Sequence, residues 1–237
     1  MIRGVDTLWF VTDENWLGYN EYPDYLYDDV TWNDVNYLYN KEILYNDVIS
    51  EIVRTIKKEP KDRFDDYGIG KQQSGKENVL TAYDRPPKEE KIVEQVETDE
   101  FFSMMDRNLE KNVIAVIENN PDITFYLFFP PYSICWWDSL NQYGVDVLKR
   151  RIDMEQYAIE KLLRYENVRL FSFFNNHELI CDLDNYVDDI HYTEEVNSKI
   201  LVWMKEGKYE LTKDNYSDYL SDITGFYCNY DYENIFN

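Results

Sequence analysis

Ile123-Thr-Phe-Tyr-Leu-Phe-Phe129 is a short stretch that is apolar apart from one threonine, and Pro130-Pro131 follows it directly. A run of this length without polar alternation is typical of a strand that is buried on both faces, as in a parallel sheet. Proline cannot donate a hydrogen bond to a neighbouring strand, so the two prolines end the strand. The stretch therefore predicts a central strand of a parallel sheet.

Expected helices and strands alternate on both sides of this strand, because apolar residues recur at helical spacing before and after it. The other expected strands cover Met1–Asp6 and Val168–Phe173, and the expected helices begin near Asn46, Phe101, Val145 and Thr193, the last of them ending at Gly207. This order predicts an α/β fold with a parallel sheet and helices on both faces, which is a three-layer sandwich.

These elements predict a single α/β domain over residues 1–207. Between residues 60 and 90 the composition shifts to charged residues, three glycines and the Pro86-Pro87 pair, which predicts a polar insertion within that domain. Residues 208–237 are rich in tyrosine and aspartate and contain no base after Lys213. We expect this segment to be an acidic tail that packs on the domain or trails from it.

The charge balance excludes two classes of partner. The chain has 47 acidic and 24 basic residues, a net charge of −23 and a pI of about 4.3. That charge repels a phosphate backbone and an anionic membrane, so we expect no nucleic-acid partner. No apolar run approaches the roughly 18 residues of a transmembrane helix. Cys135, Cys181 and Cys228 lie far apart without a CxxC motif, so we expect neither a zinc site nor another cofactor.

Ten aromatic residues fall between Trp9 and Tyr39, in a stretch with seven acids and no Lys or Arg. Two interpretations are open. Rings beside carboxylates suit stacking on sugars, so the segment could wall a carbohydrate site. Tyrosines also serve as amphipathic cover for a core, and this second interpretation is the commoner role of such segments.

A possible catalytic pair lies directly before the helix that starts at Thr193. In Asp188-Asp189-Ile190-His191, the carboxylate of Asp188 can accept a hydrogen bond from the near ring nitrogen of His191. The other ring nitrogen is then free to take a proton from a nucleophile. The alternative is that Asp188 and Asp189 are solvated acids favoured by the helix dipole, with His191 an incidental neighbour.

Three stretches of the sequence occur in the order found in a known family. They are the segment from Asn120-Pro121 through Pro130-Pro131-Tyr132-Ser133, then Val168-Arg-Leu-Phe171, and then Asp188-x-x-His191. Together they resemble the carboxyl half of an SGNH (GDSL-like) hydrolase. It is particularly similar to SGNH-like proteins of the bacterial cell envelope. The resemblance implies a flavodoxin-like α/β fold, in which His191 is the general base of a Ser-His-Asp triad and Asp188 orients it. It also implies the extracytoplasmic face of a bacterial membrane.

This sequence departs from the pattern of that family in two of its sequence blocks. No Gly-Asp-Ser occurs in the chain, and Gly4-Val5-Asp6 is the nearest match to the Gly-x-Asn-Asp block that binds the oxyanion. An ionised Asp6 would repel an oxyanion, so we expect an oxyanion hole that is built differently or absent. If Gly4–Asp6 is that block, the first strands and the serine lie upstream of Met1, and this chain is a truncated piece.

Two other residue groups are candidates for a site. Ser133 follows the end of a predicted strand and could replace the missing serine, although an ordinary surface serine is the more frequent role. Asp182 and Asp184 lie in the same loop as Asp188 and Asp189, but the spacing lacks the glycine and glutamate of a calcium loop. We therefore expect no metal.

The sequence thus predicts ester hydrolysis or acyl transfer on an acylated carbohydrate or envelope polymer, with little or no activity on this chain because its nucleophile is missing. His191 and Asp188 are the expected catalytic residues, and Gly4, Asp6, Tyr132, Ser133 and Trp136 are the expected substrate-binding residues. The alternative is a non-catalytic module in which the same acidic, aromatic-rich surface binds a basic protein or a carbohydrate.

Overall fold

The computed structural model describes residues 1–6, 14–15, 29–33, 35, 48–58, 73–88 and 98–236. Two compact units are present. One contains Met1–Glu14 together with Gln73–Asn237, and the other contains Asn15–Gln72. The predicted aromatic segment from Trp9 to Tyr39 lies largely outside the described residues, as does much of the predicted polar insertion.

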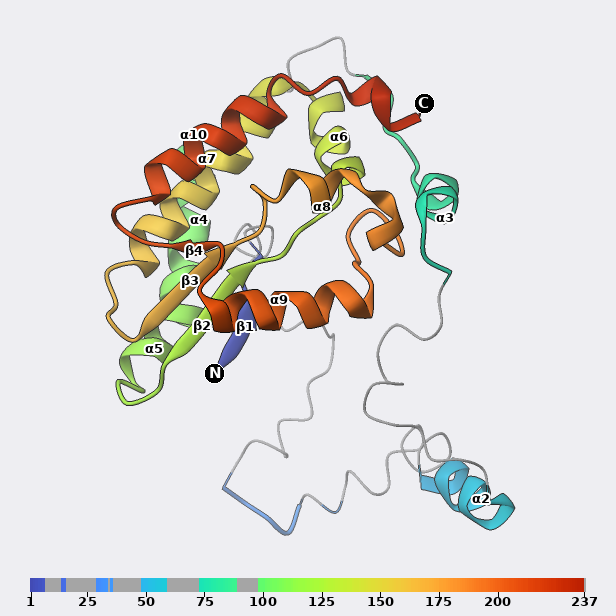
Figure 1. The fold of residues 1–237 in the computed structure, drawn as a ribbon. Helices are drawn as coiled ribbons and strands as arrows, with labels where there is room; N and C mark the ends of the chain where they lie inside the picture. The colour runs from blue at the N-terminus through green and yellow to red at the C-terminus, as the bar shows by residue number, and fades with distance from the viewer. Residues whose placement is uncertain are drawn as a thin grey trace. The chain divides into compact units, whose positions relative to one another are not determined.

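In the second unit the described helix is α2 (Ser50–Lys57), which matches the helix expected from Asn46 onward. The first unit contains all the other described elements (Figure 1). Its strands are β1 (Ile2–Gly4), β2 (Phe125–Phe129), β3 (Val168–Ser172) and β4 (Glu210–Leu211). Its helices are α3 (Lys76–Ala82), α4 (Thr98–Leu109), α5 (Ala115–Glu118), α6 (Ile134–Gln142), α7 (Val145–Leu162), α8 (His177–Cys181), α9 (Glu194–Glu206) and α10 (Tyr216–Tyr227). A π-helical turn, Glu110–Ile114, joins α4 to α5, and 3₁₀ turns cover Leu183–Asn185 and Tyr232–Phe236.

The four strands form one sheet in the order β1-β2-β3-β4. β1 pairs with β2 and β2 pairs with β3 in parallel, with Leu127 opposite both Arg3 and Leu170. β4 is antiparallel to β3. The prediction of a mixed α/β fold around a parallel sheet is therefore confirmed, with one antiparallel edge strand that the sequence did not indicate.

Alternate residues of β2 face two hydrophobic clusters, which explains why this strand is apolar throughout. Phe125, Leu127 and Phe129 are at most 2% exposed and belong to the larger cluster, with residues of α4, α6, α7 and α10. Tyr126 and Phe128 pack on a smaller cluster that contains Val196, Ile200 and Met204 of α9. Successive side chains of a strand point to opposite faces, so the two clusters lie on opposite sides of the sheet.

Gly207 ends α9 in the left-handed conformation, with φ of 71°. The sequence predicted this end because glycine carries no Cβ to penalise a positive φ. The backbone N–H groups at this end bond to the carbonyls of Trp203 and Met204, so two of the carbonyls in the last turn of the helix are satisfied.

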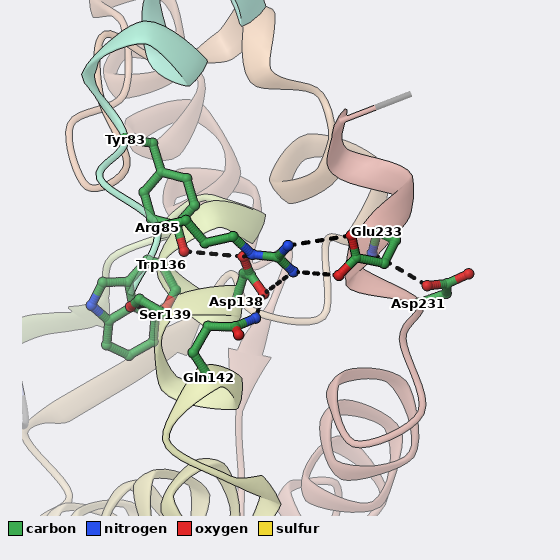
Figure 2. A network of polar contacts seen from close by, with 8 residues as sticks. All are labelled: Tyr83, Arg85, Trp136, Asp138, Ser139, Gln142, Asp231 and Glu233. Carbon is green, nitrogen blue, oxygen red and sulfur yellow. Dashed lines mark hydrogen bonds and ion pairs between the residues drawn. The ribbon is translucent and has the colours of Figure 1, made fainter. Parts of the chain in front are cut away.

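The C-terminal segment packs on the domain rather than trailing from it. Its helix α10 buries Tyr219, Leu220, Ile223 and Tyr227. At its end, Glu233 pairs with the guanidinium of Arg85, which also pairs with the fully buried carboxylate of Asp138 on α6 (Figure 2). The segment after α3, helix α6 and the C-terminal turn are thus tied together by one arginine.

Residues 73–88 of the predicted insertion form part of the unit that contains the sheet. Val79 of α3 is fully buried, and Gly75 N–H donates to the carbonyl of Tyr186 at 2.9 Å. The described part of the predicted insertion therefore packs on the rest of this unit. Within the described part of the chain, no helix has the length and apolar character required to cross a membrane.

Candidate functional site

The residues that the sequence singles out lie on three neighbouring segments of the first unit. Gly4 and Asp6 belong to the end of β1, Tyr132 and Ser133 follow β2, and Asp188 and His191 lie between α8 and α9. Because β1 and β2 are parallel neighbours, their carboxyl ends meet at one edge of the sheet, where ligands of open α/β folds bind.

Asp188 and His191 are directly hydrogen-bonded. The ring Nδ1 of His191 lies 2.7 Å from Oδ2 of Asp188. An ionised carboxylate can only accept, so in the neutral imidazole Nδ1 carries the hydrogen and Nε2 has the lone pair. Nε2 makes no hydrogen bond to any described residue, and the His191 side chain is 53% exposed. The pair therefore presents a basic nitrogen to solvent.

The local backbone holds this pair in place. The second carboxylate oxygen of Asp188 accepts from the backbone N–H groups of Ile190, at 2.9 Å, and His191, at 2.6 Å. This is an Asx turn, a conformation that aspartate favours because its short side chain reaches the backbone two residues ahead. Val187 N–H donates to the carbonyl of His191 at 2.8 Å and closes the turn. Both oxygens of Asp188 are thereby oriented.

The pKa values of the two neighbouring carboxyls of the loop, Asp188 and Asp189, are shifted in opposite directions. Partial burial raises the pKa of Asp188, but hydrogen bonds from the His191 ring and from two backbone N–H groups outweigh it, so the pKa lies below its ordinary value. Burial raises the pKa of Asp189 above its ordinary value. The ionised form of Asp188 is therefore the one that its hydrogen bonds favour beside the imidazole.

Ser133 is not the surface serine that we expected. It is fully buried, and its hydroxyl donates to the carbonyl of Asp189 at 2.8 Å. Its backbone N–H points to the same oxygen at 3.2 Å. Ser133 therefore fixes the Asp188–His191 loop to the start of α6, and its hydroxyl is occupied by a structural hydrogen bond.

Asp6 and Tyr132, both expected to bind substrate, are bonded to each other. The Tyr132 hydroxyl donates to Oδ2 of Asp6 at 2.5 Å, and both residues are less than 10% exposed. Burial, followed by the neighbouring Asp6 charge, raises the pKa of Tyr132 far above its ordinary value. This bond joins the end of β1 to the loop after β2, and Gly4 lies at the same strand end, near Phe128 and Pro130.

Trp136 packs against Tyr132. Its ring is 5% exposed, 4.9 Å from the ring of Tyr132, and the guanidinium of Arg151 sits 5.1 Å from the indole centroid. All three guanidinium nitrogens of Arg151 are buried and have no hydrogen-bond partner among the described residues. Tyr132 and Trp136 therefore serve mainly as packing, and little of their ring surface is free for a substrate.

Helix α3 supports the site loop through contacts that the sequence did not indicate. Lys76 N–H donates to Oδ1 of Asp184, and the side-chain amide of Asn78 donates to the carbonyl of Val187 at 2.8 Å. These contacts join residues more than one hundred positions apart. Helical spacing and capping signals are local features of the sequence and carry no information about contacts between distant residues. These two contacts therefore could not be predicted.

No family model, curated protein or solved structure matches this sequence. Among the described residues, no group of three or more His, Cys, Asp or Glu side chains lies where it could hold a metal ion. The chemistry of the site must therefore be argued from its own geometry. An imidazole held by a carboxylate, with its second nitrogen open to solvent, can accept a proton from a hydroxyl or a water molecule and return it later.

Proposed function

We propose that this chain is an SGNH-hydrolase-like domain with a three-layer α/β sandwich and the Asp–His half of an acyl-transfer site. His191 acts as the general base and Asp188 fixes its tautomer. The proposal is supported above all by the 2.7 Å contact between His191 Nδ1 and Asp188 Oδ2, which leaves Nε2 free on a half-exposed ring.

The position of the pair adds support. It lies in a loop attached through Ser133 to the start of α6, directly after the carboxyl end of β2. Catalytic groups of parallel-sheet enzymes gather at this edge. The reaction class that fits is ester hydrolysis or acyl transfer, and the resemblance to cell-envelope proteins favours an acylated carbohydrate or polymer as the substrate.

The described residues offer no serine nucleophile next to this base, since the Ser133 hydroxyl is buried and bonded to a carbonyl. We therefore expect slow turnover that depends on the imidazole alone. Loss of the serine of a triad lowers the catalytic rate by many powers of ten. Substrate binding and electrostatic effects then account for the small rate that remains.

The test is hydrolysis of p-nitrophenyl acetate at pH 8 by the full chain and by three variants. His191→Ala should lower the rate to that of buffer plus the contribution of the other histidine. His177→Ala is the matched control, because its ring Nε2 faces Asp222 and its Nδ1 is buried. Ser133→Ala should keep the His191-dependent rate. Equal rates for the wild type and His191→Ala would overturn the proposal.

A second candidate function is a non-catalytic binding module. The observation in its favour is the same burial of Ser133, which leaves the described site with a base and no nucleophile. In that case the acidic surface would serve a basic partner through electrostatic steering. A chain that hydrolyses no ester through His191 but binds a basic protein with strong salt dependence would fit this second function.

A further inference from the structure

A buried arginine and a buried glutamate lie one turn apart in the middle of α7. Arg151 is 4% exposed, and Glu155 is fully buried. Residues four positions apart on a helix are neighbours on one face, so the two side chains can reach each other. Nevertheless, the three guanidinium nitrogens of Arg151 and Oε2 of Glu155 make no hydrogen bond within the described part of the chain. Buried donors and a buried acceptor are thus left unsatisfied within one helical turn.

The guanidinium of Arg151 lies on aromatic rings instead. Its Cζ is 5.1 Å from the ring centroid of Trp136 and 6.0 Å from that of Phe174. Ring faces attract cations, and this attraction is stronger where water is excluded. The rings do not accept the hydrogen bonds that the guanidinium N–H groups require, and buried N–H groups without an acceptor are costly. A charged acceptor within reach can therefore draw Arg151 away from the rings.

The two oxygens of the Glu155 carboxyl differ in their contacts. Oε1 accepts from the Tyr219 hydroxyl at 2.5 Å and lies 3.1 Å from the Ser172 hydroxyl. In the neutral carboxyl the proton therefore sits on Oε2, because donors already occupy Oε1. This neutral group offers Arg151 no charge. Loss of the proton turns Oε2 into a negatively charged acceptor one helical turn from the guanidinium.

Glu155 changes charge near neutral pH, while the tyrosines that face it do not. Burial raises the pKa of Glu155 from 4.5 to about 7, although the Arg151 cation and the hydroxyl donors oppose this rise. The titratable groups that face Glu155 from α10, which packs on α7 (Figure 1), are Tyr219 and Tyr227. Burial raises the pKa of both tyrosines well above the ordinary 10, so both stay neutral while Glu155 titrates.

Arg151 is faced from the other side by Tyr132, which interacts with its charge. Burial raises the pKa of Tyr132 far above its ordinary value, so this residue also stays neutral. The Tyr132 hydroxyl donates to Asp6, which brings a second carboxylate to this region. Asp6 is thus the competing partner for Arg151, and a variant at Asp6 can separate its effect from that of Glu155.

We propose that Arg151 is a pH-operated switch with two positions. When Glu155 is neutral, the guanidinium lies on Trp136 and Phe174, the position seen in the structure. When Glu155 loses its proton to solvent, the guanidinium turns to Oε2 and forms a buried ion pair. Two opposite unit charges in a low-dielectric core attract each other more strongly than a cation attracts a ring.

The switch lies next to the segment that holds the Asp188–His191 loop. Trp136 packs against Tyr132, with 4.9 Å between the ring centroids, and the neighbouring Ser133 donates to the carbonyl of Asp189. When Arg151 turns away, the ring of Trp136 loses its cation at this point. The movement itself does not require the proposed acyl-transfer activity.

The test follows Arg151 and Glu155 in nuclear magnetic resonance spectra of the full chain, with ¹³C-labelled arginine and glutamate, from pH 5 to pH 9. A nuclear Overhauser effect between the δ-methylene protons of Arg151 and the ring protons of Trp136 is expected at pH 5 and should be lost by pH 9. The midpoint of this loss should lie near pH 7 and coincide with that of the Glu155 carboxyl carbon. An Overhauser effect that persists at pH 9, or two different midpoints, would overturn the proposal.

Three variants show which carboxylate moves the arginine. Glu155→Gln cannot ionise, so its Arg151 should stay in contact with Trp136 at every pH. Asp6→Asn should still lose this contact, with a midpoint close to that of the wild type. Glu160→Gln, on the exposed side of α7, is the charge-matched control and should behave as the wild type does. Loss of the contact in Glu155→Gln, or its persistence at pH 9 in Asp6→Asn, would assign the movement to another group and overturn the proposal.

Discussion

The Tyr219 hydroxyl donates to the carboxylate of Glu155 at 2.5 Å, and this bond joins α10 to α7 inside the core. Both residues are essentially buried, and the Ser172 hydroxyl lies within 3.1 Å of the same carboxylate oxygen. Burial raises the pKa of Glu155 from its ordinary 4.5 to about 7, although the Arg151 cation and the two hydroxyl donors oppose that rise. A core carboxyl is therefore poised to lose its proton near neutral pH.

This bond predicts how stability depends on pH. Below about pH 4.5 the folded and the unfolded chain both hold the Glu155 proton, whereas between about pH 4.5 and 7 only the folded chain does. The free energy of unfolding therefore falls as pH rises through this window. In Glu155→Gln this contribution disappears. Relative to the variant, the wild type should lose about 1–3 kcal/mol between pH 5 and pH 8.

Urea unfolding at pH 5, 6, 7 and 8 measures this difference. Glu160→Gln is the matched control, because Glu160 lies on the exposed side of the same helix. Its stability should run parallel to that of the wild type. The absolute stability of Glu155→Gln also reflects the loss of a counter-charge near buried Arg151, so the decisive quantity is the slope with pH.

The two histidines of the chain should occupy opposite tautomers. His191 faces Asp188 through Nδ1, and His177 faces Asp222 through Nε2. Long-range ¹H–¹⁵N spectra at pH 8 should show the Nδ1–H form for one ring and the Nε2–H form for the other. Asp188→Ala removes the acceptor that selects the tautomer of His191, so this ring alone should become a mixture. Asp222→Ala should affect only His177, and an identical tautomer for both rings would contradict the structure.

Arg85 should contribute far more to stability through Asp138 than through Glu233. Asp138 is fully buried, and Arg85 contacts both of its oxygens, whereas the Glu233 side chain is 71% exposed (Figure 2). Arg85→Ala leaves a buried charge without its partner and should cost about 3 kcal/mol. Glu233→Ala should cost less than about 1 kcal/mol. Guanidinium chloride or urea midpoints give both values.

A double variant separates the buried charge from the lost side chain. In Arg85→Ala combined with Asp138→Asn, the carboxylate that lost its partner is neutral, so part of the lost stability should return. Additive losses in the double variant would show that Arg85 acts through packing on Phe236, whose ring lies 4.7 Å from its guanidinium.

The sequence was sufficient for elements whose apolar residues form a continuous run or recur at an even spacing. β2, β3, α7 and α9 fall at the predicted places because their buried positions follow the period of a strand or a helix. The Asp188–His191 contact was also predictable, since its two residues are three positions apart and belong to one turn.

Elements with amphipathic buried residues escaped prediction. Helix α6 buries Trp136 and Trp137, and α10 buries Tyr219 and Tyr227, so tyrosine and tryptophan replace the aliphatic pattern there. The polar networks of the core were not predictable either. Glu155 and Tyr219 are 64 positions apart in the sequence, and Arg85 and Glu233 are 148 positions apart. Only the folded structure brings the two residues of each pair into contact.

Two glycines should respond in opposite ways to the same substitution. Gly207 has φ of 71°, and a Cβ there would also meet a Glu210 carboxylate oxygen at 3.4 Å. Gly207→Ala should therefore cost about 1–2 kcal/mol, the penalty of the left-handed conformation. Gly225 lies within α10 with no heavy atom near its Cβ position, and Gly225→Ala should gain about 0.5–1 kcal/mol because alanine favours the helix. Thermal unfolding of both variants measures the two changes in stability. Destabilisation by Gly225→Ala would contradict the open space around the Cβ position of Gly225 in the structure.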